Sequence, residues 1–267
     1  YPNVPGGNIN WLSGHAAAFL GDTMYVVGGG PNRNASRDVY RYNIKSNTWD
    51  TGIALPTPKS WGSLVTCGNK LYYLGGCDSI YNIPDSLTYC YSPVTGKWTR
   101  KANISIPVYG NGSACYKDSI IYILFGGPYL KNVQVYFPDS DTWSEATSLP
   151  GTYGRRGFAS GIEGNRIYIC GNVGTYSMPL ILGTINPSNS LLINWDSVAN
   201  FPLQVTEASG TAYGGKLYVV SHSILNNMAV YDTTFHFWTL YGGKRFEVSG
   251  YDNGVTSKIV NGGLKIF

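Results

Sequence analysis

The sequence predicts an all-β protein built from repeated small sheets, and three observations support this. An apolar residue followed by a residue that is almost always tyrosine recurs every 46–50 residues, and a tryptophan recurs every 43–52 residues. Within each unit, short apolar runs are separated by turns rich in Asn, Asp and Gly. Two markers that recur with a nearly constant spacing along the chain indicate internal repeats, and a repeat of this length determines the fold class. No window of about 11 residues has the apolar spacing of a helix.

The first marker belongs to a predicted hairpin that opens each unit. Its apolar–Tyr anchors are Met24-Tyr25, Leu71-Tyr72, Ile121-Tyr122, Ile167-Tyr168, Leu217-Tyr218 and the variant Leu264-Lys265. A run of small residues, such as Ala16-Ala17-Ala18, precedes the anchor, and a turn such as Gly68-Asn69 separates the two. Asx/Gly turns of this kind adopt positive φ and are typical of two-residue β-hairpins.

The second marker belongs to a second predicted hairpin in the same unit. The tryptophans are Trp49, Trp98, Trp143, Trp195 and Trp238. Four of them follow a tyrosine by seven residues, in the pairs Tyr42/Trp49, Tyr91/Trp98, Tyr136/Trp143 and Tyr231/Trp238. The residues between are Asn, Ser, Pro, Asp and similar turn formers, so each unit is expected to be one four-stranded sheet.

The residues that follow the anchors resemble kelch repeats. Glycine pairs at Gly28-Gly29, Gly75-Gly76 and Gly126-Gly127, each followed by the Tyr…Trp pair, carry the resemblance. It covers residues 1–267 and implies a single domain, a kelch-type β-propeller whose four-stranded sheets are its blades. The pattern departs in the fourth and fifth units (Gly171-Asn172, Ser221-His222), in extra residues before Trp195 and in one extra residue before Gly126.

The two ends of the chain bear on the number of blades. Leu264 marks the first two strands of a sixth unit, and Tyr1 falls near the place of a preceding unit's tryptophan. We therefore expect six four-stranded blades, the last one closed by N- and C-terminal strands and incomplete. Seven blades, or a chain that is a segment of a longer protein, are the alternatives.

Composition excludes some classes of function and favours a location. Charged residues make up 13% of the chain, the net charge is +4, and no Lys/Arg run occurs, so no nucleic-acid partner is expected. No apolar stretch reaches the ~20 residues of a membrane span. Low charge with much Gly, Ser, Asn and Tyr favours an extracellular or cell-envelope protein over a cytoplasmic one. The sequons at Asn34, Asn103 and Asn111 matter only in that setting.

Motifs for catalysis or cofactor binding are missing from the sequence. The histidines His15, His222 and His236 come from different points of the repeat, in no metal-binding spacing. The five cysteines form no CxxC pair, and Cys67, Cys115 and Cys170 lie in apolar runs as expected for buried thiols. We expect a non-catalytic protein without cofactor or metal. The family resemblance leaves a mutarotase-like enzyme open, whereas the Tyr/His/Cys site of copper-radical oxidases is not matched.

The candidate binding residues lie just upstream of the first strand of each unit, where propellers carry their ligand-binding loops. They are Trp11, Trp61, Tyr109, Tyr153, Arg155, Arg156, Glu207, Tyr251 and Asp252. Aromatic faces together with Arg and carboxylates suit a protein, peptide or glycan ligand. In a purely structural interpretation, the aromatics fill the channel and the arginines pair with the carboxylates. An enzyme acting on a sugar or small acid, and an adaptor or structural domain of a larger protein, are the other hypotheses.

Overall fold

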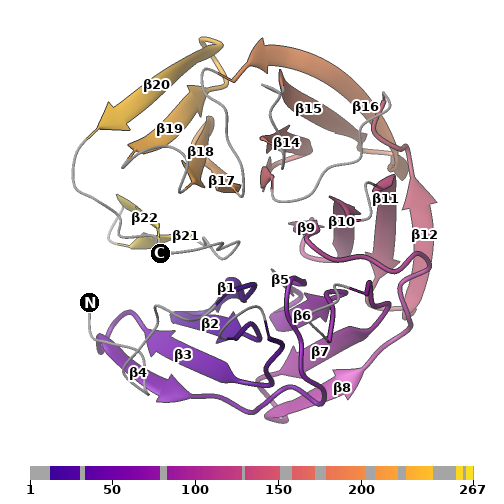
Figure 1. The fold of residues 1–267 in the computed structure, drawn as a ribbon. Coiled ribbons are helices and arrows are strands. Elements are labelled where there is room, and N and C mark those ends of the chain that lie inside the picture. The colour runs from indigo at the N-terminus through magenta and orange to yellow at the C-terminus, as the bar shows by residue number, and fades with distance from the viewer. Residues whose placement is uncertain are drawn as a thin grey trace. The chain divides into compact units, whose positions relative to one another are not determined.

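A computed structural model describes residues 13–30, 34–78, 83–127, 130–150, 158–171, 179–201, 208–221, 227–242, 257–260 and 263–266. The regular structure in these ranges is entirely β, in five four-stranded antiparallel sheets and one two-stranded sheet (Figure 1). The chain divides into two compact units, residues 1–111 with 250–267, and residues 112–249. None of the described ranges holds a helix long and apolar enough to cross a membrane.

The first unit contains two complete blades and the two-stranded sheet. Blade 1 consists of β1 (Ala16–Leu20), β2 (Thr23–Val27), β3 (Val39–Asn43) and β4 (Thr48–Thr51). Blade 2 consists of β5 (Ser63–Cys67), β6 (Lys70–Leu74), β7 (Thr88–Ser92) and β8 (Lys97–Arg100). The two-stranded sheet is formed by β21 (Ser257–Val260) and β22 (Gly263–Ile266).

The second unit contains three complete blades. Blade 3 consists of β9 (Gly112–Tyr116), β10 (Ile120–Gly126), β11 (Leu130–Phe137) and β12 (Thr142–Ala146). Blade 4 consists of β13 (Ala159–Glu163), β14 (Arg166–Cys170), β15 (Pro179–Asn186) and β16 (Asn189–Asn200). Blade 5 consists of β17 (Ala208–Tyr213), β18 (Lys216–Ser221), β19 (Asn227–Asp232) and β20 (Phe237–Gly242).

The periodic tyrosines and tryptophans that mark the repeat are packing residues. In blades 1, 2, 3 and 5 the Tyr of the third strand lies directly opposite the Trp of the fourth. The ring centroids of these pairs are 4.9–5.3 Å apart. In blade 4 the residue opposite Trp195 is Gly183, where a Cβ would come within 2.4 Å of the indole. The tryptophan therefore covers the place that a tyrosine fills elsewhere.

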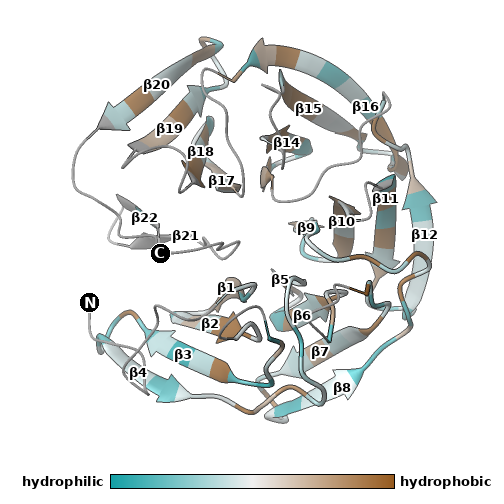
Figure 2. Ribbon diagram, in the orientation of Figure 1, coloured by the Kyte–Doolittle hydropathy of each residue, from teal (hydrophilic) through white to brown (hydrophobic). Residues whose placement is uncertain are grey.

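Neighbouring blades within a unit share apolar cores, which explains the near-continuous apolar runs of the second strands. On β14, Ile167 and Ile169 belong to the core shared with blade 3, whereas Tyr168 and Cys170 belong to the core shared with blade 5. Side chains alternate between the faces of a strand, so a strand covered on both sides must be apolar throughout. Figure 2 shows the hydrophobic colour on β10 and β14 and the hydrophilic colour on the fourth strands β4, β8 and β12.

The repeat prediction is confirmed. Among the described residues, five blades have four strands, and β21 and β22 stand where the first two strands of the incomplete sixth blade were expected. The N-terminal strand expected to close that blade falls on residues 1–12, outside the described residues. The extra residue of the third unit forms a β-bulge between Leu124 and Gly126, with Phe125 at φ 48°.

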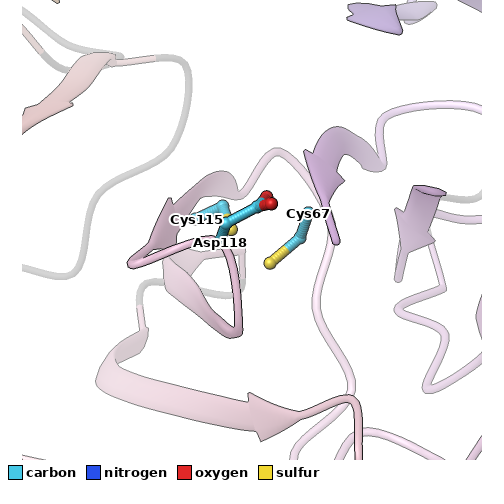
Figure 3. Close-up of side chains that lie close together, drawn as sticks. All are labelled: Cys67, Cys115 and Asp118. Carbon is cyan, nitrogen blue, oxygen red and sulfur yellow. The ribbon is translucent and has the colours of Figure 1, made fainter. Parts of the chain in front are cut away.

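The expectation of buried thiols holds for Cys170 but is wrong for Cys67 and Cys115, which are disulfide-bonded. Cys67 ends β5 with 1% of its surface exposed, and Cys115 lies half-buried in β9, in the hairpin that also holds Asp118 (Figure 3). Cys77, Cys90 and Cys170 are buried thiols. The sequence had left Cys77 and Cys90 unplaced.

Candidate binding surface

The candidate surface of the first unit begins at the glycine pairs that end β2 and β6. A Cβ on Gly28 would lie 2.6 Å from the carbonyl oxygen of Lys59, and a Cβ on Gly75 would lie 2.6 Å from that of Val108. The next glycine of each pair, Gly29 or Gly76, donates its N–H to the same carbonyl at 2.8 Å. The pairs thus let the segment that enters the following blade approach at backbone distance.

Each of the three described segments that enter blades 1, 2 and 3 contains a residue with left-handed backbone two positions before the first strand of its blade. These residues are Gly14 before β1, Trp61 before β5 and Gly110 before β9, with φ of 70°, 58° and 58°. Trp61 donates its N–H to the carbonyl oxygen of Gly14 at 2.7 Å, and Gly110 donates its N–H to that of Trp61 at 2.6 Å. A backbone chain of hydrogen bonds therefore links three successive entering segments. We call it the left-handed chain.

Trp61 is the unusual member of the left-handed chain. Positive φ suits glycine, and a bulky side chain there costs of the order of 1–3 kcal/mol. Its indole lies against Gly14, where a Cβ would be 3.0 Å from Nε1 and Cε2. The side chain is half-buried, and its Nε1 is covered without a hydrogen-bond partner among the described residues. Trp61 thus carries two costs that glycine avoids at the equivalent positions in the entering segments on either side.

Buried polar groups hold the segment around Trp61 in place. The ammonium of Lys59, 1% exposed, pairs with the carboxylate of Asp85, which also accepts the N–H of Leu87. The N–H of Gly62 is donated to the hydroxyl of the buried Tyr73 at 3.3 Å. Burial raises the pKa of Tyr73 well above its ordinary value, so this hydroxyl stays neutral. The Trp61 backbone is therefore fixed on both sides.

The structure places two of the predicted binding residues. Trp61 and Tyr109 both lie half-buried in entering segments of the first unit, and Tyr109 directly precedes Gly110 of the left-handed chain. The other predicted residues are Trp11, Tyr153, Arg155, Arg156, Glu207, Tyr251 and Asp252, which lie outside the described residues. The sequence did not reveal the left-handed chain or the Lys59–Asp85 pair. Aligning the units would have shown the first, as a glycine column interrupted by Trp61.

The sequons and histidines have ordinary structural environments where they are described. Asn111 is 8% exposed and donates its side-chain amide to Ser63 at 2.7 Å, so its sequon is buried. Asn34 and Asn103 are exposed. His236 lies in the hairpin turn of blade 5 and contacts the hydroxyl of Tyr231 at 3.0 Å. His222 lies outside the described residues.

Comparison with known proteins gives the family. Residues 2–172 match the model of the KLHDC2/KLHL20/DRC7 Kelch-repeats domain. Kelch-like protein 23 of Homo sapiens is 28% identical over 242 residues, which are 85% of this chain and 41% of that protein. Kelch-like protein 36 of Bos taurus is 31% identical over 151 residues, which are 51% of this chain and 24% of that protein.

A third relative, the Kelch repeat and BTB domain-containing protein 12 of Danio rerio, is 26% identical over 182 residues, which are 59% of this chain and 29% of that protein. The chain spans less than half the length of each of these relatives. The family match covers most of the chain and agrees with the glycine pairs, the Tyr–Trp pairs and the four-stranded blades. The chain belongs to the kelch-repeat family and has the fold class of a kelch-type β-propeller.

Proposed function

We propose that the chain is a non-catalytic binding propeller that recognises a protein or peptide through the segments entering its blades. Kelch propellers are typically protein-interaction domains. The observation that carries the proposal is Trp61, a tryptophan at a left-handed position that Gly14 and Gly110 fill in the neighbouring segments. Strain of this kind persists where function requires it, and tryptophan is among the residues most enriched at the centres of protein interfaces.

The backbone around Trp61 makes it suitable as an anchor. Hydrogen bonds to Gly14 and from Gly110 fix the main chain, and Lys59, two residues before Trp61, is held by its buried pair with Asp85. A side chain that is already ordered loses little entropy when a partner covers it. The half-buried Tyr109 adds a second aromatic in the next segment. Tyr153, Arg155, Arg156 and Glu207 remain predicted contributors from the second unit.

The variant that tests this proposal is Trp61→Gly, because glycine occupies the equivalent position on both sides. The intact chain is first screened on a peptide array and a glycan array, and a selected peptide is then titrated by calorimetry. We expect Trp61→Gly to lose roughly tenfold or more in peptide affinity while the melting temperature is retained. Val94→Thr, on the exposed β7–β8 turn, is the control and should bind normally.

Three outcomes would contradict the proposal. Unchanged affinity in Trp61→Gly removes Trp61 from the site, and binding to glycans alone assigns a carbohydrate ligand instead. Turnover of an array sugar would make the protein an enzyme. The Arg155→Ala/Arg156→Ala double variant, measured with the same peptide, tests the predicted contribution of the second unit.

A further inference from the structure

A second surface, on blade 5, is built unlike the equivalent surface of the other blades. The turn between β19 and β20 has the same form as those of blades 1, 2 and 3, with one left-handed residue two positions before the tryptophan of the fourth strand. These left-handed residues are Asn47, Gly96, Asp141 and His236, with φ between 53° and 62°. Residues at equal offsets from them are therefore structurally equivalent between blades.

Blade 5 places apolar side chains where the other three blades have exposed polar ones. The residue before the left-handed position is Phe235 in blade 5 and Ser46, Thr95 or Ser140 elsewhere. The residue after it is Phe237 in blade 5 and Thr48, Lys97 or Thr142 elsewhere. The residue four positions after it is Leu240 in blade 5 and Thr51, Arg100 or Glu145 elsewhere. All nine polar equivalents are exposed, so these positions face solvent in this fold.

The apolar side chains remain in water in blade 5. Phe235, Phe237 and Leu240 are 73%, 51% and 43% exposed, and Tyr241 is 51% exposed. Because side chains alternate along a strand, Phe237 and Tyr241 share one face of the β20 edge and Leu240 lies on the other. The rings of Phe235 and Phe237 lie 6.4 Å apart. Figure 2 shows the hydrophobic bands of β20 in contrast with the hydrophilic bands of β4, β8 and β12. We call these four residues the blade 5 patch.

The hairpin that presents the patch is held rigid. The carboxylate of Asp232 accepts the N–H groups of Thr234 and Phe235 at 2.9 and 3.0 Å. The hydroxyl of Tyr231 contacts His236 Nδ1 at 3.0 Å. The phenyl rings are therefore carried on an ordered turn and not on a loose tip, which lowers the entropy lost on binding.

β20 also differs from the other fourth strands because it carries no charged side chain. β20 pairs with β19 and is the last strand of its sheet, and within the described ranges no strand pairs with its other side. Charged residues on exposed edges prevent such strands from pairing with other chains. Asp50 lies on β4, Lys97 and Arg100 on β8, Glu145 on β12 and Asp196 on β16. β20, of sequence FWTLYG, has none.

We propose that the edge of β20, with the blade 5 patch, is a second docking site, which binds an extended, uncharged segment of a protein partner by β-strand addition. Main-chain hydrogen bonds along the edge supply affinity, and the patch receives apolar side chains at alternate positions of the segment. A charged segment is disfavoured because its charges would lose water against an apolar edge without gaining a counter-charge. The site is separate from the proposed Trp61 surface and does not depend on it.

The size of the patch favours a peptide segment over a second copy of the chain. Its four side chains expose on the order of 400 Å² together, since one aromatic side chain accounts for ~150–250 Å² when fully buried. A stable association of folded proteins needs about 800 Å² on each partner. An extended segment makes up the difference with main-chain hydrogen bonds, which a second folded surface does not supply here.

The probe is a panel of synthetic peptides of about ten residues, the length of a long strand, that alternate threonine with an apolar residue. Binding to the intact chain is compared with a triple variant, Phe235→Ser, Phe237→Thr and Leu240→Thr, which takes the residues that blade 1 has at these positions. We expect a loss of roughly tenfold or more in affinity, with an unchanged melting temperature. Val94→Thr is the matched control, because Val94 is 89% exposed on the equivalent turn of blade 2, where blade 5 has Thr234.

N-methylation of the peptide separates strand addition from simple adsorption. Alternate amides of a strand point to the same edge, so methylating one alternate set should abolish binding and methylating the other should not. Equal effects of the two sets, or equal binding by the triple variant, would overturn the proposal. If the wild-type chain formed a dimer and the triple variant were a monomer, a second copy of the chain would cover the patch. If the Trp61→Gly variant also lost affinity for the same peptide, the peptide would bind at the Trp61 surface and not at β20.

Discussion

Glycine at the start of the pairs in blades 1 and 2 is required for two separable reasons, a positive φ and a close backbone contact. Gly75 has φ +65°, and a Cβ added there would lie 2.6 Å from the carbonyl oxygen of Val108. Gly96, in the β7–β8 turn, has φ +62° but nothing within 4 Å of its would-be Cβ. The two residues therefore share the backbone conformation and differ in the contact.

Alanine substitutions at these glycines should separate the two costs. Gly96→Ala is expected to lower the free energy of unfolding by about 1 kcal/mol, the cost of left-handed backbone for an L-residue. Gly75→Ala is expected to cost about 3 kcal/mol or more, because the collision adds to the strain. Urea unfolding followed by tryptophan fluorescence measures both. Equal losses in the free energy of unfolding would show that the contact with Val108 does not affect stability.

At the scale of elements, the hairpin between the third and fourth strands recurs with one plan and different side chains. Tyr42 contacts Asn47 and Tyr136 contacts Asp141 through their hydroxyls at 2.5 and 2.6 Å. His236 takes this place opposite Tyr231. The tyrosine thus closes the turn from the strand side, while its ring packs on the tryptophan.

The turn of blade 5 should respond to acid through Asp232. Its pKa is lowered by the N–H groups of Phe235 and Thr234 that the carboxylate accepts. A lowered pKa in the folded state means that the turn is stabilised above the ordinary Asp value and loses this support as the pH falls through the lowered value. Amide chemical shifts of Thr234 and Phe235 should therefore titrate below the usual Asp range. Asp232→Asn should abolish that titration, and a midpoint above pH 4 would contradict the hydrogen bonds.

At the scale of the whole molecule, each compact unit has cores of its own. Residues 112–249 hold three blades joined by two shared cores, one between blades 3 and 4 and one between blades 4 and 5. A set of sheets that buries its apolar faces internally meets the main condition for folding alone.

A fragment of residues 112–249 is therefore expected to fold. It should show a β-type far-ultraviolet spectrum, near-ultraviolet bands from Trp143, Trp195 and Trp238, and one cooperative unfolding transition. Circular dichroism and urea titration test this. A broad transition without near-ultraviolet bands would mean that the fragment lacks fixed packing and depends on the rest of the chain.

Most of the fold was predictable because the packing residues repeat. The Tyr–Trp pairs, the glycine pairs and the two-residue turns occur in phase, and each has the same physical role in the blades that contain it. The binding surface was less predictable because its residues are those that break the repeat. Trp61 was identified as an aromatic in a loop, but its left-handed backbone depends on hydrogen bonds to Gly14 and Gly110, which no local pattern records. The exposure of Phe235 and Phe237 likewise emerges only when equivalent positions are compared.

The left-handed chain also has a consequence for how such a protein evolves. Glycine and tryptophan codons differ by a single base, GGG against TGG, so one mutation converts the residue at Gly14 or Gly110 into the residue at Trp61. The hydrogen bonds of this chain use only main-chain atoms, and they are kept whichever residue is present. Propellers of this kind can therefore gain or lose an aromatic anchor in one genetic step, blade by blade, on an inherited scaffold that does not have to be rebuilt.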